Sequence, residues 1–191
     1  MRRQMTINKD EIIQLTKEYG GEWGLSHTQR ILHLISVIDE GKEYDKEALW
    51  IAAHLHDWGG YKKWAKPGID HATRSAEVAG NFMRERSYSD TTMKLVLECI
   101  STHHSGGKER SFEAILLSDA DGLDFLGAIG IFRDISKNTK ELRKGYEIIK
   151  KRMQNIPNLL CIEQSKEIAK DRIIEMNNIL NAFEGSSFGY Y

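Results

Sequence analysis

The chain has 191 residues, of which 40% are hydrophobic and 29% charged, and its net charge is −1. This profile indicates one ordinary globular domain and excludes a general electrostatic attraction to nucleic acid or anionic membranes. No segment reaches the roughly 20 apolar residues of a membrane span, and the start lacks the apolar run of a secretion signal. The two cysteines, Cys99 and Cys161, lie in helical patterns with no CxxC spacing. We expect reduced core residues and a cytoplasmic location.

Apolar residues recur at spacings of three and four along the chain, and no segment alternates as a half-buried strand would. We therefore expect an all-α bundle of about seven to nine helices. The expected helices cover about 8–19, 26–40, 46–57, 71–86, 90–104, 111–133, 139–153 and 162–183. Glycines at 20 and 21 should separate the first two helices. We expect a single domain over residues 1–184, with its functional core at about 26–133, and a C-terminal tail at 185–191.

The most informative stretch is the helix that ends in His56-Asp57. Residues 48–55 are apolar almost all round, so this helix should be buried. Two glycines after Trp58 end it, which places the imidazole and the carboxylate at a helix terminus. These side chains are ligands that divalent ions accept, and a metal would satisfy polar groups that are costly to bury. His54 is two residues earlier and points in another direction, so we do not expect it to be a ligand.

Four other histidines lie near expected helix ends. His27 is in the first turn of its helix, on the same side as Arg30. His71 opens another helix, and His103-His104 end an apolar helix that Ser105-Gly106-Gly107 breaks. Each histidine taken alone is more often structural than functional. Their shared position at helix ends favours one common cavity.

Three carboxylates follow the apolar run 114–117, namely Asp119, Asp121 and Asp124. Asp121 and Asp124 can share a helix face, whereas Asp119 points elsewhere. An ordinary core helix does not concentrate uncompensated acids in this way. Asp57 and Asp121 together with the histidines predict a divalent metal site, and mixed imidazole and carboxylate ligands with open positions suit hydrolysis.

The order His27, His56-Asp57, Asp121 resembles the H…HD…D pattern of the HD-domain metal-dependent phosphohydrolase superfamily, in particular its small single-domain branch. The resemblance spans residues 26–133. It also includes the segment around His103-His104 and the Asp119–Asp124 run. It implies an all-α bundle that holds a divalent ion (Mn, Fe, Ni, Co, Zn or Mg).

The resemblance assigns roles residue by residue. It implies four metal ligands, which are His27, His56, Asp57 and Asp121. Asp119 is the alternative to Asp121 as the last ligand. A second ion could be held by His71, His103 and His104. Alternatively, His71 and His103 bind the substrate phosphate or donate a proton to the leaving group, and Arg30 contacts phosphate.

Two departures from the family pattern bear on the substrate. Some nucleotidase members carry an acid shortly after the HD pair, but residues 58–61 contain none. Related sequences often place a basic residue where this chain has Gly122.

The hypothesis is a phosphohydrolase that cleaves a phosphate monoester or anhydride, with a nucleotide as substrate. Two rivals remain open. One is a di-iron, oxygen-dependent oxidoreductase on the same scaffold, and the other is a non-catalytic nucleotide-binding module. The sequence leaves the oligomeric state open.

Overall fold

The computed structural model describes residues 7–191 and confirms an all-α fold. The helices are α1 (Lys9–Ile38), α2 (Lys46–Leu55), the short 3₁₀-helix η1 (Trp58–Gly60), α3 (His71–Glu85), α4 (Asp90–Thr102), α5 (Phe112–Asp124), α6 (Gly127–Lys137), α7 (Leu142–Leu159) and α8 (Glu163–Ser187). Within the described part of the chain there is no strand. None of its helices is both long and apolar enough to cross a membrane.

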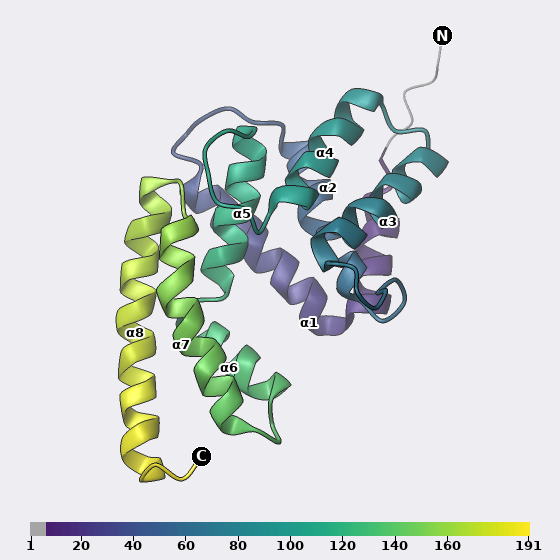
Figure 1. Ribbon diagram of the computed structural model, residues 1–191. Helices are drawn as coiled ribbons and strands as arrows, with labels where there is room; N and C mark the ends of the chain where they lie inside the picture. The colour runs from purple at the N-terminus through teal and green to yellow at the C-terminus, as the bar shows by residue number, and fades with distance from the viewer. Residues whose placement is uncertain (1–6) are drawn as a thin grey trace.

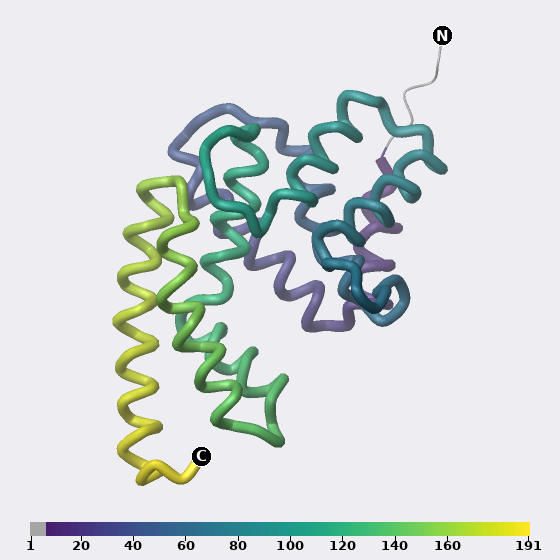
Figure 2. The backbone as a smooth tube through the Cα atoms, in the orientation of Figure 1, coloured from purple at the N-terminus to yellow at the C-terminus, as the bar shows by residue number. Residues whose placement is uncertain are grey.

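Helix α5 lies at the centre of the arrangement. On one side it contacts α1, α2 and α4, and on the other it contacts α6, α7 and α8. Helix α3 covers α4 and η1. Figure 2 shows α7 and α8 running side by side along the far flank of α5. A residue on α5 can therefore face both halves of the molecule.

Side-chain caps explain where several helices begin. A side-chain oxygen accepts a backbone N–H of the first turn in five of them, which satisfies a donor that the helix leaves free. The capping residues are Asn8, Asp45, Asp70, Ser89 and Ser111. As predicted, α2 is buried almost all round, from Ala48 to Leu55 with only Trp50 partly exposed. The polar end of this helix therefore lies inside the protein.

The first two expected helices form one element. They are described together as α1, but the backbone is non-helical at Gly21, so the predicted break at residues 20 and 21 is present as a kink between two helical segments. Its backbone bends at Gly21, whose φ of 67° belongs to the left-handed region that glycine tolerates. The glycine therefore separates two helical segments within α1, as the sequence predicted.

The expected continuous helix over 111–133 was wrong, because it divides into α5 and α6. Leu126 is extended and Gly127 has a φ of 78°, so the chain turns between the two helices. This turn ends α5 directly after Asp124. It lets α6 pack against α7 and α8.

The C-terminal region is more ordered than we expected. Helix α8 reaches Ser187, and the ring of Tyr191 lies 5.2 Å from that of Tyr146, so part of the expected tail joins the fold. Cys99 is buried as predicted. Cys161 is partly exposed in the α7–α8 connection, so its expected place in a helical core was wrong. The domain boundary at residue 184 stays a prediction.

Candidate metal centre

The end of α2 holds His56 with one ring nitrogen occupied and the other free. Its Nδ1 lies 2.9 Å from the carbonyl oxygen of Ala53. Because a carbonyl can only accept, Nδ1 carries the proton and the Nε2 lone pair is available to a ligand. Asp57 follows at the start of η1, and its Oδ2 lies 3.6 Å from His56 Nε2.

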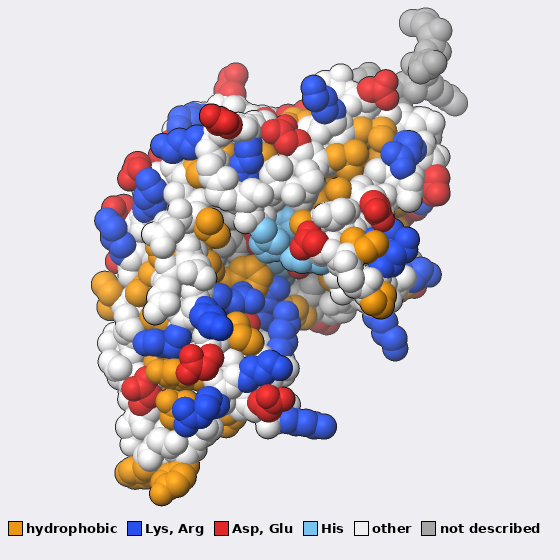
Figure 3. Space-filling model, in the orientation of Figure 1, with side chains coloured by type: hydrophobic (Ala, Val, Ile, Leu, Met, Phe, Trp, Pro, Cys, Tyr) orange, Lys and Arg blue, Asp and Glu red, His pale blue; other side chains and the backbone are white. Residues whose placement is uncertain are grey.

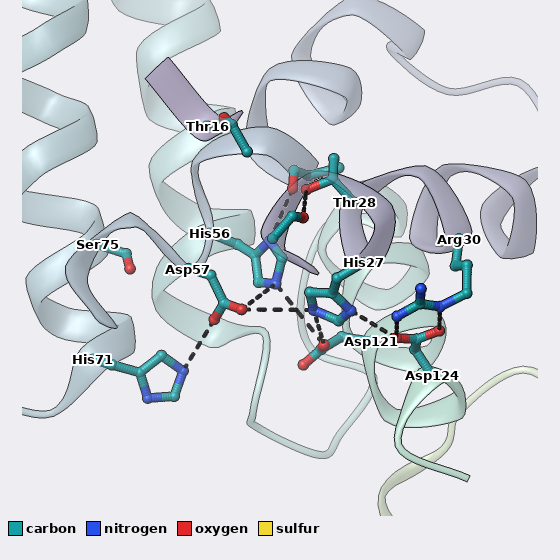
Figure 4. Close-up of polar contacts among 12 residues, drawn as sticks. Thr16, His27, Thr28, Arg30, His56, Asp57, His71, Ser75, Asp121 and Asp124 are labelled. Carbon is teal, nitrogen blue, oxygen red and sulfur yellow. Dashed lines mark hydrogen bonds and ion pairs between the residues drawn. The ribbon is translucent and has the colours of Figure 1, made fainter. Parts of the chain in front are cut away.

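Two distant helices bring a second imidazole and a second carboxylate to the same point. His27 comes from α1 and Asp121 from α5, and Figure 4 shows both side chains facing His56 and Asp57. His27 Nε2 lies 3.2 Å from Asp121 Oδ1 and 3.6 Å from Asp57 Oδ2. Ligand atoms about 2 Å from one ion are separated by roughly 3 to 3.5 Å. These spacings are close to those of a coordination shell.

His103, at the end of α4, repeats the arrangement of His56. Its Nδ1–H donates to the Ile100 carbonyl at 2.6 Å, which leaves Nε2 free. His56, His103 and Asp121 form one group that could hold an ion, and His27, His56 and Asp57 form another.

Four buried atoms in this region have no hydrogen-bond partner among the described residues. They are the Nε2 atoms of His27, His56 and His103 and the Oδ1 atom of Asp121. Leaving one such atom unsatisfied costs about 1 to 3 kcal/mol. Four of them side by side fit a bound cation, because one divalent ion would satisfy several at once.

The charges of the cluster depend on one another. Burial opposes ionisation, but the neighbouring histidines, His27 first among them, lower the pKa of Asp121. Burial likewise disfavours a charged His27, but the carboxylates of Asp121 and Asp124 raise its pKa to about 9. The carboxylates therefore stay ionised, and a positive charge between them, on His27 or on a bound ion, is stabilised.

A second imidazole group lies beside the first. It consists of His71 at the start of α3 with His103 and His104 at the end of α4. The Nε2 atoms of His71 and His104 are 2.8 Å apart, so one must carry a proton if nothing else lies between them. His71 also approaches Asp57, with 3.7 Å between Nε2 and Oδ1. Burial and the nearby charge of His56 lower the pKa of His103 to about 3, and both of its possible roles stay predictions.

Asp124 is a site residue to which the sequence assigned no role. It accepts a 2.7 Å hydrogen bond from His27 Nδ1, while Arg30 donates to its two oxygens from Nε and Nη2. Figure 4 shows this pair behind His27, on the side away from Asp57. Arg30 is thus bound to a carboxylate, and its role as a phosphate contact stays a prediction. The sequence feature that could have indicated this role is the three-residue spacing of Asp121 and Asp124, which puts both on one helix face.

Two other polar residues point elsewhere. Asp119, the alternative to Asp121, accepts the backbone N–H groups of Cys161 and Ile162 and so anchors the start of α8. His54 donates from Nδ1 to the Trp50 carbonyl at 2.9 Å. Neither residue belongs to a group that could hold an ion among the described residues.

A small pocket that is partly open to solvent lies beside the candidate metal centre, with a cavity volume of about 60 Å³. His103, His104 and Asp121 form its polar wall. Phe125 and residues 156, 159 and 160 of α7 and the α7–α8 connection form its apolar wall. The site can therefore receive a small molecule that has both a polar and an apolar part.

A family model for the HD domain matches residues 24–126. The chain belongs to the HD domain family. The matched region begins just before His27 and includes every residue of the candidate metal centre. The pattern His27, His56-Asp57, Asp121 on which the sequence resemblance rests therefore lies within a family match over more than half of the chain.

Several solved structures have the same fold over nearly the whole chain. One is described as a predicted HD superfamily hydrolase from an uncultured Thermotogales bacterium, with 24% identity over 93% of this chain and 92% of that one and a TM-score of 0.66. Lin1889 from Listeria innocua has 22% identity over 97% of this chain and 100% of that one, with a TM-score of 0.70. YpgQ of Bacillus subtilis, whose structure is a complex with ADP, has 19% identity, coverage of 93% of each chain and a TM-score of 0.71. A search of curated proteins found no match.

Proposed function

We propose that this HD-domain protein is a metal-dependent phosphohydrolase that cleaves a phosphate monoester or anhydride of a nucleotide. The observation that carries the proposal is the set of buried, unpartnered ligand atoms on His27, His56, His103 and Asp121. A structural cluster of this kind would pair its polar atoms with one another or with the backbone. Here the Nε2 atoms of His56 and His103 have no such partner, and they face the close pair of His27 and Asp121 beside an open pocket.

A divalent ion held by His27, His56, Asp57 and Asp121 would polarise a phosphoryl oxygen and make a bound water more acidic. The chain itself would provide the orientation. The Ala53 carbonyl and the Asp124 carboxylate hold the rings of His56 and His27 so that each Nε2 faces the centre.

His71 is placed to serve either role that the sequence left open. Its side chain is 37% exposed and lies 3.7 Å from Asp57, at the edge of the centre. In that position it can donate a proton to a departing oxygen, or complete a second ion site with His103 and His104. The ADP in YpgQ supports a nucleotide as the substrate class.

The test combines metal analysis with phosphate release. Purified protein is loaded separately with Mn, Fe, Ni, Co, Zn or Mg. It is then assayed on nucleoside mono-, di- and triphosphates with detection of both phosphate and pyrophosphate. We expect release with at least one ion, and its loss in the Asp57→Ala variant. No release from any substrate while the metal site is filled would remove the hydrolase proposal, and iron-dependent oxygen consumption would favour the oxidative rival.

A further inference from the structure

Two arginines of α6 and α7 lie against the ring of Phe125, and Lys137 shares the helix face of the first of them, four residues after Arg133. We call Arg133, Lys137 and Arg152 the basic cluster. The guanidinium carbons of Arg133 and Arg152 lie 4.0 Å and 3.8 Å from the centroid of the Phe125 ring. That ring is in turn 6.2 Å from the ring of His27. A single aromatic side chain therefore separates the basic cluster from the candidate metal centre.

The surface view agrees with this placement. In Figure 3 the pale-blue histidine surface lies in a hollow, and Lys and Arg side chains line the wall below it. Both features open on the same face of the molecule. A ligand that reaches the histidines from this face can also reach cations.

Arg133 is the unexplained member of the basic cluster. It is only 6% exposed, yet its Nε and Nη1 atoms have no hydrogen-bond partner among the described residues. A buried guanidinium without partners is costly unless an anion or an acceptor completes it. Stacking on Phe125 fixes the plane of the guanidinium but does not satisfy its N–H donors.

The charge of the basic cluster is not balanced locally. The carboxylate in contact with it is Asp134, whose Oδ2 lies 3.1 Å from Arg152 Nε. One acid faces three cations. Desolvation by the surrounding protein and the like charges of Arg133 and Arg152 lower the pKa of Lys137. Two more distant carboxylates also attract these cations: Asp57 acts on Lys137 and Asp121 on Arg152. A bound metal would neutralise the charge of both carboxylates.

We propose that the basic cluster binds phosphoryl groups of the substrate that lie beyond the one at the metal centre. This inference rests on the proposed function and narrows it. A monoester has no phosphoryl group to place there, so the substrate class is a phosphoanhydride such as a nucleoside di- or triphosphate. Guanidinium groups match phosphate oxygens through paired N–H donors, and a lysine at the rim adds a point charge.

Helix α7 supports the same assignment. Arg152 and Ile156 are four residues apart and therefore share a face of α7. Ile156 lines the apolar wall of the pocket. Cations, metal ligands and apolar surface therefore lie next to one another around Phe125. A molecule with a phosphate chain and a nucleoside has this distribution of chemistry.

The test compares the binding of pyrophosphate with that of inorganic phosphate to metal-loaded protein, by calorimetry at equal free metal concentration. The variants are Lys137→Gln on α6 and Arg152→Gln on α7. The matched control is Lys151→Gln, which neutralises an exposed lysine of α7. We expect each cluster variant to bind pyrophosphate roughly tenfold more weakly, because it loses a charge-assisted contact. Phosphate affinity should stay within about twofold in all three variants.

Unchanged pyrophosphate affinity in Lys137→Gln, or an equal loss for phosphate and pyrophosphate, would overturn the inference. Lys137 is exposed, so this variant decides the question even if Arg152→Gln, which leaves Asp134 unpaired, does not fold. Binding is measured separately from turnover, so the two proposals fail in different ways. If the cluster variants lose pyrophosphate binding selectively but the wild-type protein hydrolyses no nucleotide, the phosphate subsite is supported and the proposed enzymatic activity is not. If the wild-type protein hydrolyses nucleotides but the cluster variants bind pyrophosphate as well as it does, the activity is supported and the phosphate subsite is not.

Discussion

His27 and Asp124 are 97 residues apart in the chain and are joined by a buried hydrogen bond of 2.7 Å between Nδ1 and Oδ2. Arg30 holds the same carboxylate from its other side, with 2.6 Å between Nε and Oδ1. The bond fixes the rotation of the imidazole and directs Nε2 towards Asp57 and Asp121. A carboxylate behind a histidine ligand also makes that ligand more basic.

The Asp124→Asn substitution should therefore weaken metal binding without unfolding the protein. Loss of the carboxylate behind a histidine ligand typically lowers metal affinity by about 10- to 100-fold. Competition with a fluorescent chelator measures the affinity, and far-ultraviolet circular dichroism measures helical content. The control is Asp171→Asn, an exposed acid on α8. Equal metal affinity in the two variants would show that Asp124 does not position His27.

Asp119 and Asp121 should separate into a structural and a metal-binding residue. Asp119→Ala leaves the N–H groups of Cys161 and Ile162 without their acceptor, so the free energy of unfolding should fall by about 1 to 3 kcal/mol. Its metal content should be unchanged. Asp121→Ala should lose the metal. Urea unfolding and metal analysis of both variants check this pair, and metal loss in Asp119→Ala alone would reverse the ligand assignment.

The two glycines after the HD pair should respond differently to alanine. A Cβ at Gly59 would lie 2.3 Å from Ser75 N and 2.6 Å from the His71 carbonyl oxygen, so η1 could not approach α3 as it does. At Gly60 the nearest contact is the His71 Cβ at 3.8 Å, an ordinary separation. We expect Gly59→Ala to cost about 1 to 3 kcal/mol of stability and to weaken metal binding, because it displaces the segment that carries Asp57. Equal melting temperatures for the two variants would contradict this packing.

The two thiols should differ in their reaction with a disulfide reagent. Burial, followed by the charges of Glu113 and Glu98, raises the pKa of Cys99 to about 12. Since the thiolate is the reactive form, labelling of Cys99 in the folded protein should stay negligible from pH 7 to 9 and rise only near pH 12 or on unfolding. Partly exposed Cys161 should react without unfolding. Two rapidly labelled thiols at pH 8 would contradict the buried position of Cys99.

The sequence predicted the parts of the site that depend on local pattern. The buried α2 helix, the glycines that follow Asp57, and the start of α3 at His71 can be recognised from spacing and composition alone. The family pattern added His27 and Asp121 as companions of His56-Asp57. The glycine pair at residues 20 and 21 likewise marks the kink at Gly21 that separates the two segments of α1.

Other features depend on contacts between distant segments. The role of Asp124 comes from α1, which supplies both His27 and Arg30. The basic cluster forms only because a turn at Gly127 brings α6 against α7, and the predicted unbroken helix over 111–133 had no such turn. In the sequence, Arg133 and Arg152 lie near the ends of two different predicted helices, 111–133 and 139–153. No local pattern marks them as neighbours of a metal centre.

The most direct test of the account is the metal-to-protein ratio of wild-type protein and the Asp57→Ala variant after identical loading and desalting. Helical content is measured on the same samples. We predict at least one tightly held divalent ion per wild-type chain, and a large loss of that ion in the variant with helical content retained. Full occupancy in folded Asp57→Ala protein, or no retained ion in the wild type with any of the metals tested, would contradict the assignment of His27, His56, Asp57 and Asp121 as a metal centre.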